Sequence, residues 1–192
     1  MRISNELQIG KAGEYMVCSD LILKGFVAFI SEQGLPYDVL LDTGKKILRV
    51  QVKTTLAPRI IPQRSKESLA YIFNVKRNGK NNRKRYEGTE IDLFALVCLD
   101  TKSVGYIQTD LMPDTINIRV DSLKGTYYDE KGLQDFTSVC SMRGKSLKEI
   151  SKKTGLHIST VSRMLQEGYK PYETGARYFS DFERSKEWFY TI

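Results

Sequence analysis

The chain has 192 residues, a formal net charge of +7 and 41% hydrophobic residues. This composition suits one packed domain of ordinary size, alone or with a small additional module. The sequence has no long uncharged apolar run and no signal-peptide segment. We therefore expect an intracellular protein (in the cytoplasm, the nucleoid or an organelle) that is not secreted and has no membrane partner. The positive charge favours a polyanionic partner, because Lys and Arg displace the counterions condensed on phosphates.

The thiols and the single imidazole exclude some kinds of site. Cys18, Cys98 and Cys140 are scattered beside apolar residues, which suits reduced packing positions better than disulfides or zinc ligands. His157 is the only histidine. Chemistry that needs several histidines or a zinc ion is therefore disfavoured.

Residues 5–24 predict a helix, because Asn5 is a plausible N-cap and no proline interrupts the run. Apolar residues cover much of its circumference, so we expect a well-buried helix. Glu14 lies near the apolar stripe, where an ionised carboxylate is costly unless it is paired or bound to a metal. The alternative is that Glu14 sits at a solvent edge. Gly10 and Gly13 provide small surfaces for close approach to a sheet or to DNA, or serve as packing glycines.

Two strand segments follow the helix. Residues 25–30 are a continuous apolar run that predicts a buried strand, and the stretch 36–53, PYDVLLDTGKKILRVQVK, predicts a β-hairpin. If Gly44-Lys45 is its two-residue loop, glycine comes first, as a type II′ turn prefers. Val39 then lies opposite Val50, and Leu41 lies opposite Leu48, on an apolar face suited to a core.

The other face of the hairpin carries three polar groups. The same register places Asp38 opposite Gln51, and Lys53 follows two residues on. Directly opposed residues have Cβ atoms about 4.5–5.5 Å apart, so a carboxylate, an amide and an ammonium are expected to converge. The ordinary alternative is a polar face that simply meets water.

This pattern resembles the PD-(D/E)XK nuclease superfamily. Pro36 and Asp38, with Tyr37 inserted between them, match the first half of the motif, and Gln51-Val52-Lys53 match the (D/E)-X-K half. Gln in place of the acid is the form seen in PD-(D/E)XK homing endonucleases encoded in group I introns. The chain is most similar to those enzymes over roughly its first two thirds.

The resemblance implies an α/β, restriction-endonuclease-like core, with a mixed central sheet flanked by helices. It implies hydrolysis of DNA phosphodiester bonds with Mg²⁺ as cofactor, for which Mn²⁺ substitutes. Glu14, Asp38 and Gln51 are then the expected metal ligands, and Lys53 completes the catalytic set. These oxygen ligands are acceptable to Mg²⁺. Gln51 carries one negative charge less than Glu, so we expect weaker metal affinity, with Glu14 compensating.

Beyond the hairpin, residues 56–68 predict a polar loop that suits DNA contact, with Arg59, Gln63, Arg64 and Lys66 exposed. Residues 69–75 predict a further strand. The run from 76 to 85 has six basic residues and no acid, which favours contact with the phosphate backbone over a merely solvated surface. Its predicted DNA-binding residues are Lys76, Arg77, Lys80, Arg83, Lys84 and Arg85.

Residues 90–99 and 105–108 predict a second hairpin across a turn at 101–103. Asp92, in its first strand, could brace the sheet or a basic neighbour. Residues 109–136, which contain the alternating stretch INIRV, predict a peripheral strand and irregular packing.

A second motif begins at Ser146. Ser146 and Glu149 match a capping box, and Gly155 is placed to end the helix in the left-handed conformation. A second helix opens at Ile158, so the pair predicts a helix-turn-helix, with Leu147, Ile150, Val161 and Leu165 facing inward. The residues expected to meet DNA are Ser159, Thr160, Arg163 and Gln166. The alternative is a plain helical hairpin that packs on the core or on a partner.

The C-terminal tail is rich in aromatic residues: Tyr172, Tyr178, Phe179, Phe182, Trp188 and Phe189. We expect them to close a small core around these two helices. The alternative is that they stack on bases. The expected organisation is thus a nuclease core over 1–140 and a helix-turn-helix module with its aromatic tail over 141–192. This segment also resembles the helix-turn-helix repeats appended to intron-encoded homing endonucleases.

The expected function is site-specific cleavage of double-stranded DNA. Cutting both strands needs two active sites, which implies a homodimer or a higher symmetric homo-oligomer. One alternative is a Holliday-junction resolvase or a restriction-type endonuclease on the same core. The other is a non-catalytic DNA-binding regulator whose sheet domain only dimerises.

Overall fold

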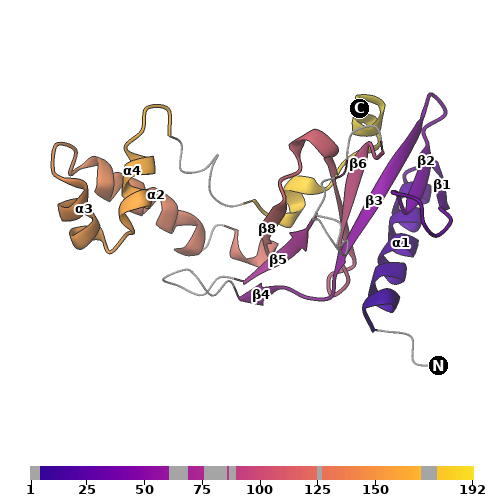
Figure 1. Ribbon diagram of the computed structural model, residues 1–192, viewed down its shortest axis with the longest axis horizontal. Helices are drawn as coiled ribbons and strands as arrows, with labels where there is room; N and C mark the ends of the chain where they lie inside the picture. The colour runs from indigo at the N-terminus through magenta and orange to yellow at the C-terminus, as the bar shows by residue number, and fades with distance from the viewer. Residues whose placement is uncertain (1–4, 61–68, 76–85, 87–89, 125–126, 170–176) are drawn as a thin grey trace. The chain divides into compact units, whose positions relative to one another are not determined.

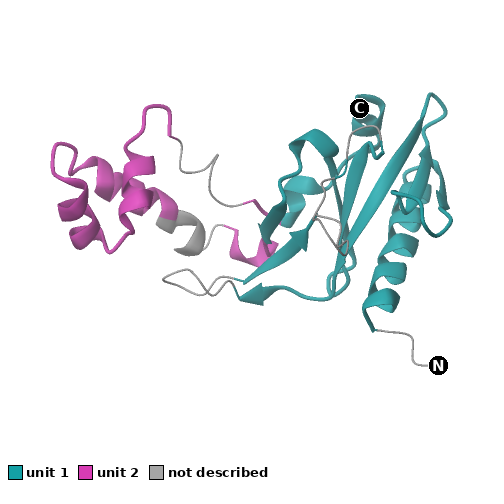
Figure 2. Ribbon diagram, in the orientation of Figure 1, with its two compact units in different colours: residues 1–118, 179–192 teal, residues 119–178 magenta. Residues whose placement is uncertain are grey.

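The structure is a computed structural model that describes residues 5–60, 69–75, 86, 90–124, 127–169 and 177–192, with the backbone alone for 127–131 (Figure 1). The chain divides into two compact units (Figure 2). The first comprises residues 1–118 and 179–192, and the second comprises residues 119–178. No helix in the described part of the chain is both long and apolar enough to span a membrane.

The first unit is built on a mixed five-stranded sheet with the order β1-β2-β3-β6-β7. Its strands are β1 (Val27–Ile30), β2 (Val39–Asp42), β3 (Ile47–Thr55), β6 (Leu93–Cys98) and β7 (Ser103–Gln108). β3 and β6 are parallel, and the other neighbours are antiparallel. Helix α1 (Asn5–Leu23) lies alongside β1, β2 and β3 (Figure 1). This mixed sheet with a flanking helix is the restriction-endonuclease-like architecture that the resemblance implied.

A smaller sheet has the order β4-β5-β8, formed by β4 (Arg59–Ile60), β5 (Leu69–Asn74) and β8 (Thr115–Arg119). Short 3₁₀ helices complete the chain: η1 (Thr109–Leu111), η2 (Asp121–Leu123), η3 (Phe179–Phe182) and η4 (Lys186–Tyr190). The strand expected between residues 109 and 136 is therefore β8.

The predicted hairpin is confirmed in its register. Val39 pairs with Val50 and Leu41 with Leu48, and all four side chains are buried in the core. Gly44 has φ 77°, and the Thr43 N–H donates to the Lys46 carbonyl across the two-residue loop. Alternation of apolar and polar residues sets this register, because a slip of one residue would move the apolar set to the other face.

The second hairpin, β6–β7, is also present, and Asp92 braces the sheet beside it. Its Oδ2 accepts from the Arg49 backbone N–H (2.7 Å) and from Arg49 Nε (3.0 Å), while its Oδ1 accepts from Arg49 Nη2 (3.0 Å). This carboxylate thus joins β3 to the start of β6, as expected for a sheet brace.

Two expectations about burial are wrong. β1 is an edge strand whose Val27 and Phe29 are 52% and 58% exposed, and its other face is only half-buried. α1 buries Gly13, Val17, Cys18 and Leu21 but leaves Leu7 and other large side chains exposed. Continuous apolar composition does not show how many faces of an element are covered.

The second unit is a helical bundle of α2 (Tyr127–Cys140), α3 (Leu147–Thr154) and α4 (Ile158–Met164). Its core consists of Val139, Ile150, Val161 and Met164. The capping box of Ser146 and Glu149 forms, and Gly155 ends α3 with φ 71°. Leu147, expected to face inward, is 38% exposed. Helix α2 was not predicted.

The units differ from the expected division at residue 140. α2 packs with α3 and α4, and the backbone bridge between Arg119 and Tyr178 brings together the two ends of the second unit. Phe182 and Phe189 are buried in the first unit, where the Phe189 ring meets Tyr106 and Phe26 at centroid distances of 4.9 and 5.4 Å. The last part of the aromatic tail therefore completes the core of the first unit and does not pack around α3 and α4. The helix that packs with α3 and α4 is α2.

Candidate active site

Glu14, Asp38, Gln51 and Lys53 line one cleft of about 720 Å³ in the first unit. Glu14 comes from α1, Asp38 from the residue before β2, and Gln51 and Lys53 from β3. Thr54, Thr55 and Arg59 line the same cleft, together with the end of β5. The fold thus gathers all four predicted residues, from three separate elements, around one solvent-accessible space.

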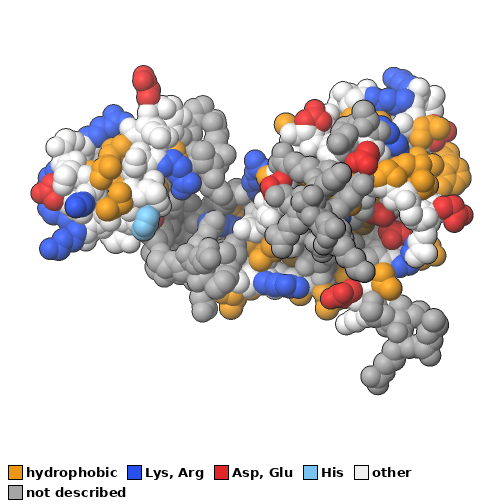
Figure 3. Space-filling view, viewed as in Figure 1, with side chains coloured by type: hydrophobic (Ala, Val, Ile, Leu, Met, Phe, Trp, Pro, Cys, Tyr) orange, Lys and Arg blue, Asp and Glu red, His pale blue; other side chains and the backbone are white. Residues whose placement is uncertain are grey.

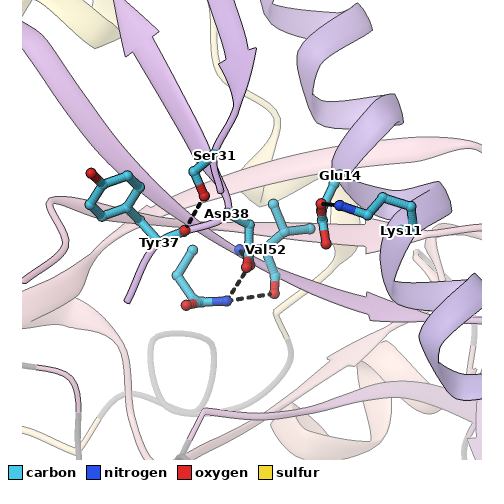
Figure 4. Close-up of polar contacts among 7 residues, drawn as sticks. Lys11, Glu14, Ser31, Tyr37, Asp38 and Val52 are labelled. Atoms are coloured by element: carbon cyan, nitrogen blue, oxygen red, sulfur yellow. Dashed lines mark hydrogen bonds and ion pairs between the residues drawn. The ribbon is translucent and has the colours of Figure 1, made fainter. Parts of the chain in front are cut away.

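Asp38 is held by its backbone and by its carboxylate. Its N–H donates to the Val50 carbonyl (2.9 Å), and its carbonyl accepts from the Ser31 N–H (2.9 Å). Its Oδ2 accepts from the Val52 N–H (2.8 Å) and from Gln51 Nε2 (Figure 4). The carboxylate therefore has a fixed position at the start of the hairpin.

Gln51 is buried, with 7% of its surface exposed. Its Nε2 donates to Asp38 Oδ2 and to the Val52 carbonyl (3.3 Å). The amide nitrogen, and not the oxygen, therefore faces Asp38. The predicted juxtaposition of these two side chains is present, and a hydrogen bond joins them.

Glu14 is paired within its own helix. Lys11 Nζ lies 2.5 Å from Glu14 Oε2, an (i, i+3) ion pair visible in Figure 4, and the glutamate side chain is 17% exposed. Sequence reasoning did not single out Lys11. The spacing of three residues on a predicted helix was the signal that could have found it.

The electrostatics of the cleft favour added positive charge. Burial raises the pKa of Asp38, the Val52 N–H opposes that shift, and the negative charge of Glu14 adds to it. The ammonium groups of Lys53 and Lys11 oppose this rise and lower the pKa of Asp38. The hydrogen bond from Lys11 to Glu14 raises the pKa of Lys11 despite partial desolvation. A buried carboxylate whose ionisation is disfavoured by burial and by a neighbouring negative charge is a suitable environment for a cation.

The oxygen atoms present fit a hard divalent ion. Glu14 and Asp38 are carboxylates, and the Gln51 oxygen is available if its amide rotates, so that the three side chains offer the donors that Mg²⁺ prefers. Within the described residues, no group of three or more His, Cys, Asp and Glu side chains is placed to hold a metal. The candidate metal ligands of the cleft are thus two carboxylates and one neutral amide, as the Gln in the motif implied.

Lys53 contacts an aromatic residue that sequence reasoning missed. Its Nζ donates to the Tyr86 hydroxyl (3.3 Å) and lies 5.1 Å from the centroid of the Tyr86 ring. Tyr86 is thirty-three residues away in the chain. No local pattern in the sequence pointed to this contact.

The predicted DNA contacts of the first unit lie mostly outside the described residues. This holds for the basic run Lys76, Arg77, Lys80, Arg83, Lys84 and Arg85, and for Gln63, Arg64 and Lys66 of the preceding loop. Arg59 is described, exposed and part of the cleft lining.

The second unit exposes much of its predicted recognition surface. Arg163 and Gln166 are exposed and Thr160 is half-buried, and α4 ends before Gln166, which follows in a turn. The Ser159 N–H donates to His157 Nδ1 (3.3 Å), and the Ser159 hydroxyl lies 2.7 Å from the same nitrogen. His157 is thus the N-cap of α4. Lys and Arg side chains spread over the visible face of this unit (Figure 3).

Comparison with known proteins places the chain in a family. The model of the PD-(D/E)XK endonuclease family matches residues 4–131. The solved structure of a bacterial homing endonuclease, I-Ssp6803I, is similar in fold, with a TM-score of 0.50 and 15% sequence identity over 75% of this chain and 100% of that one. A search of curated proteins gave no match. Since the family match spans most of the chain and includes the cleft, this protein belongs to the PD-(D/E)XK endonuclease family.

Proposed function

We propose that the protein is a site-specific endonuclease that hydrolyses duplex DNA with Mg²⁺, for which Mn²⁺ substitutes. The observation that carries the proposal is the convergence of Glu14, Asp38, Gln51 and Lys53 on one cleft of a family member. The structural likeness to a homing endonuclease supports the same fold.

Each residue has a distinct role in this proposal. Asp38, Glu14 and the amide oxygen of Gln51 would hold the divalent ion, which would supply Lewis-acid polarisation of the scissile phosphate. Lys53 orients the attacking water by hydrogen bonding, and its ammonium offsets the negative charge that grows on the phosphate. The carboxylate oxygens that would hold the ion include those that Lys11 and the Gln51 nitrogen contact in this structure.

The second unit supplies DNA affinity or specificity in the proposal. Ser159, Thr160, Arg163 and Gln166 contact bases or phosphates, and the basic run from Lys76 to Arg85 contacts the backbone. A homodimer or higher symmetric homo-oligomer provides the two active sites that a double-strand break needs, and this favours a near-palindromic target.

The test is cleavage of a randomised plasmid library by the purified full chain with Mg²⁺, beside Asp38→Asn. Asp42→Asn is the matched control, because Asp42 lies in β2 and outside the cleft, where its Oδ1 accepts from the Gly44 N–H (2.7 Å). We expect breaks at one long, partly degenerate site. Asp38→Asn should reduce the rate roughly a hundred- to a thousandfold, and Asp42→Asn should not.

Other outcomes identify other functions. Preference for four-way junctions over linear duplex would indicate a junction resolvase. Duplex binding that is unaffected by substitution of Glu14, Asp38 and Lys53, with no nicking at any Mg²⁺ concentration, would indicate a non-catalytic regulator. A fully active Asp38→Ala protein would overturn the assignment of the site.

A further inference from the structure

Helix α1 meets strand β3 at Gly13 with no side chain of the helix between them. Gly13 is buried, and a Cβ placed on it would lie 1.9 Å from Thr54 Oγ1 and 3.0 Å from Thr54 Cβ and Cγ2. Rotation of the Thr54 side chain would remove the shortest of these distances but not the one to its Cβ. Three residues earlier in the helix, a Cβ at Gly10 would meet nothing within 4 Å. The close approach is therefore a property of Gly13 and not of both glycines.

This contact lies beside two residues of the candidate active site. Glu14 follows Gly13 in α1, and Lys53 precedes Thr54 in β3. Glu14, Lys53 and Thr54 all line the cleft. A side chain moves with the backbone of its own element, so the spacing of α1 and β3 at this point sets how far the Glu14 carboxylate reaches into the cleft.

The ion pair of Glu14 does not hold it against the sheet. Lys11, its partner at 2.5 Å, belongs to the same helix and moves with it (Figure 4). A metal ligand must lie within about 0.2 Å of its proper distance. Relieving a contact of 3.0 Å to an ordinary one of 3.4–4 Å needs a shift of at least about 0.4 Å. A methyl group at Gly13 would therefore displace Glu14 by more than a ligand tolerates.

The contact leaves a polar group of the strand unsatisfied. Thr54 Oγ1 is buried and has no hydrogen-bond partner among the described residues. A buried hydroxyl without a partner has lost its hydration and gained nothing in exchange. Local departures of this kind concentrate at functional sites, where the position of a group matters more than its contribution to stability. The location of Thr54 beside the cleft fits that pattern.

We propose that Gly13 is a positioning residue for Glu14: because it has no side chain, α1 packs against Thr54 of β3 and the Glu14 carboxylate lies in the cleft with Asp38. Gly13 contacts neither substrate nor metal ion and acts only through Glu14. The inference rests on the proposed function, in which Glu14 would be a ligand of the divalent ion. It deepens that function by making the affinity for the ion depend on the spacing of helix and strand.

The first test needs neither metal nor DNA. In the isotope-labelled full chain, a nuclear Overhauser effect should connect the Gly13 Hα protons with the Thr54 methyl group, because Thr54 Cγ2 lies 3.0 Å from the position of a Gly13 Cβ. The absence of this effect from the unsubstituted protein would overturn the proposal, whether or not any variant folds.

The second test is the affinity of the full chain for Mn²⁺, measured from the relaxation of water protons. Gly13→Ala should weaken it about tenfold, the lower end of the loss seen when a residue that supports a metal ligand is replaced. In a Thr54→Ala background, which lacks Oγ1 and Cγ2, the same substitution should weaken it by about threefold or less. An equal loss in both backgrounds would contradict an effect through this contact.

A third background separates positioning from general distortion of the cleft. In Glu14→Gln, the change Gly13→Ala should have no further effect on Mn²⁺ affinity, because the carboxylate that it positions is gone. A further tenfold loss there would overturn the proposal. Gly132→Ala is the matched control, since a Cβ at Gly132 meets nothing within 4 Å and this residue lies in α2 of the second unit. It should leave the affinity unchanged, and thermal melting confirms that the compared variants are folded.

The outcomes separate this inference from the proposed function. Mn²⁺ binding that Gly13→Ala leaves unchanged overturns the inference and leaves the proposed function standing. Mn²⁺ binding that depends on Gly13 as expected, in a chain that cleaves no DNA, supports the inference and overturns the proposed function. An unsubstituted chain that binds no Mn²⁺ overturns both.

Discussion

The two units of this protein are stabilised in different ways. In the first unit, the site depends on residues far apart in the chain: Glu14 on α1, Asp38 and Gln51 across a hairpin, and Tyr86 against Lys53. In the second unit, the capping box at Ser146, the left-handed Gly155 and the His157 cap all lie within a dozen residues. Long-range contacts thus position the residues of the candidate active site, and local hydrogen bonds define the ends of the helices in the second unit.

The largest expected effect tests whether the units are independent. Ile150 is fully buried in the small core of the second unit, so Ile150→Ala should cost about 2–5 kcal/mol of its stability. Hydrogen exchange should accelerate for amides of α3 and α4 and stay slow in β3 and β6. Leu147→Ala, at an exposed position of the same helix, is the control. Equal acceleration in both units would show that they unfold together.

The next prediction concerns Gln51, which stands where the commoner (D/E)-X-K motif has an acid. Gln51→Glu replaces the N–H donor to Asp38 with a second carboxylate, so without divalent ion we expect a loss of about 1.5–3 kcal/mol in unfolding free energy. Mg²⁺ should return more stability to this variant than to the unsubstituted chain, and cleavage should persist. Thermal melting in EDTA and in Mg²⁺ measures the difference. Gln8→Glu, which adds the same charge on the exposed side of α1, should show no such dependence.

Two glycines of α1 should respond with opposite signs. A Cβ at Gly13 would lie 1.9 Å from Thr54 Oγ1, so Gly13→Ala forces the helix away from β3 and should cost about 1–3 kcal/mol. A Cβ at Gly10 meets nothing within 4 Å, so Gly10→Ala should stabilise the helix by about 0.5–1 kcal/mol. Urea denaturation of both variants decides the matter. A stabilised Gly13→Ala protein would refute this close approach of helix and strand.

The smallest effect concerns the Asp92 brace and pH. Burial opposes ionisation of Asp92, but its hydrogen bonds and ion pair with Arg49 outweigh that effect and lower its pKa. A carboxyl group whose pKa is lower in the folded than in the unfolded protein stabilises the fold at pH values above its unfolded-state pKa, which is near 4. This stability is lost as the pH falls through the folded-state pKa. The difference in Tm between the unsubstituted protein and Asp92→Asn should therefore be larger at pH 7 than at pH 3. A difference that does not change with pH would exclude an ionic contribution.

The sequence was informative wherever a pattern is local. The hairpin register followed from alternation of period two and one glycine turn, and α3 followed from its capping box and Gly155. Helix α2 was missed because residues 127–140 mix polar and apolar positions. The exposed face of β1 was missed because an apolar run does not reveal whether a second layer covers it.

By itself, the sequence determined the motif, the hairpin that brings Asp38 to Gln51, and the family, because each depends on residues whose spacing the chain fixes. Only the tertiary structure decided that Lys11 pairs with Glu14, that the Gln51 nitrogen faces Asp38, and that Tyr86 receives Lys53. It also decided that the chain returns after residue 178 to place Phe189 in the first core. Contacts across tens of residues are selected by packing and charge among many possible partners, and they leave no local pattern in the sequence.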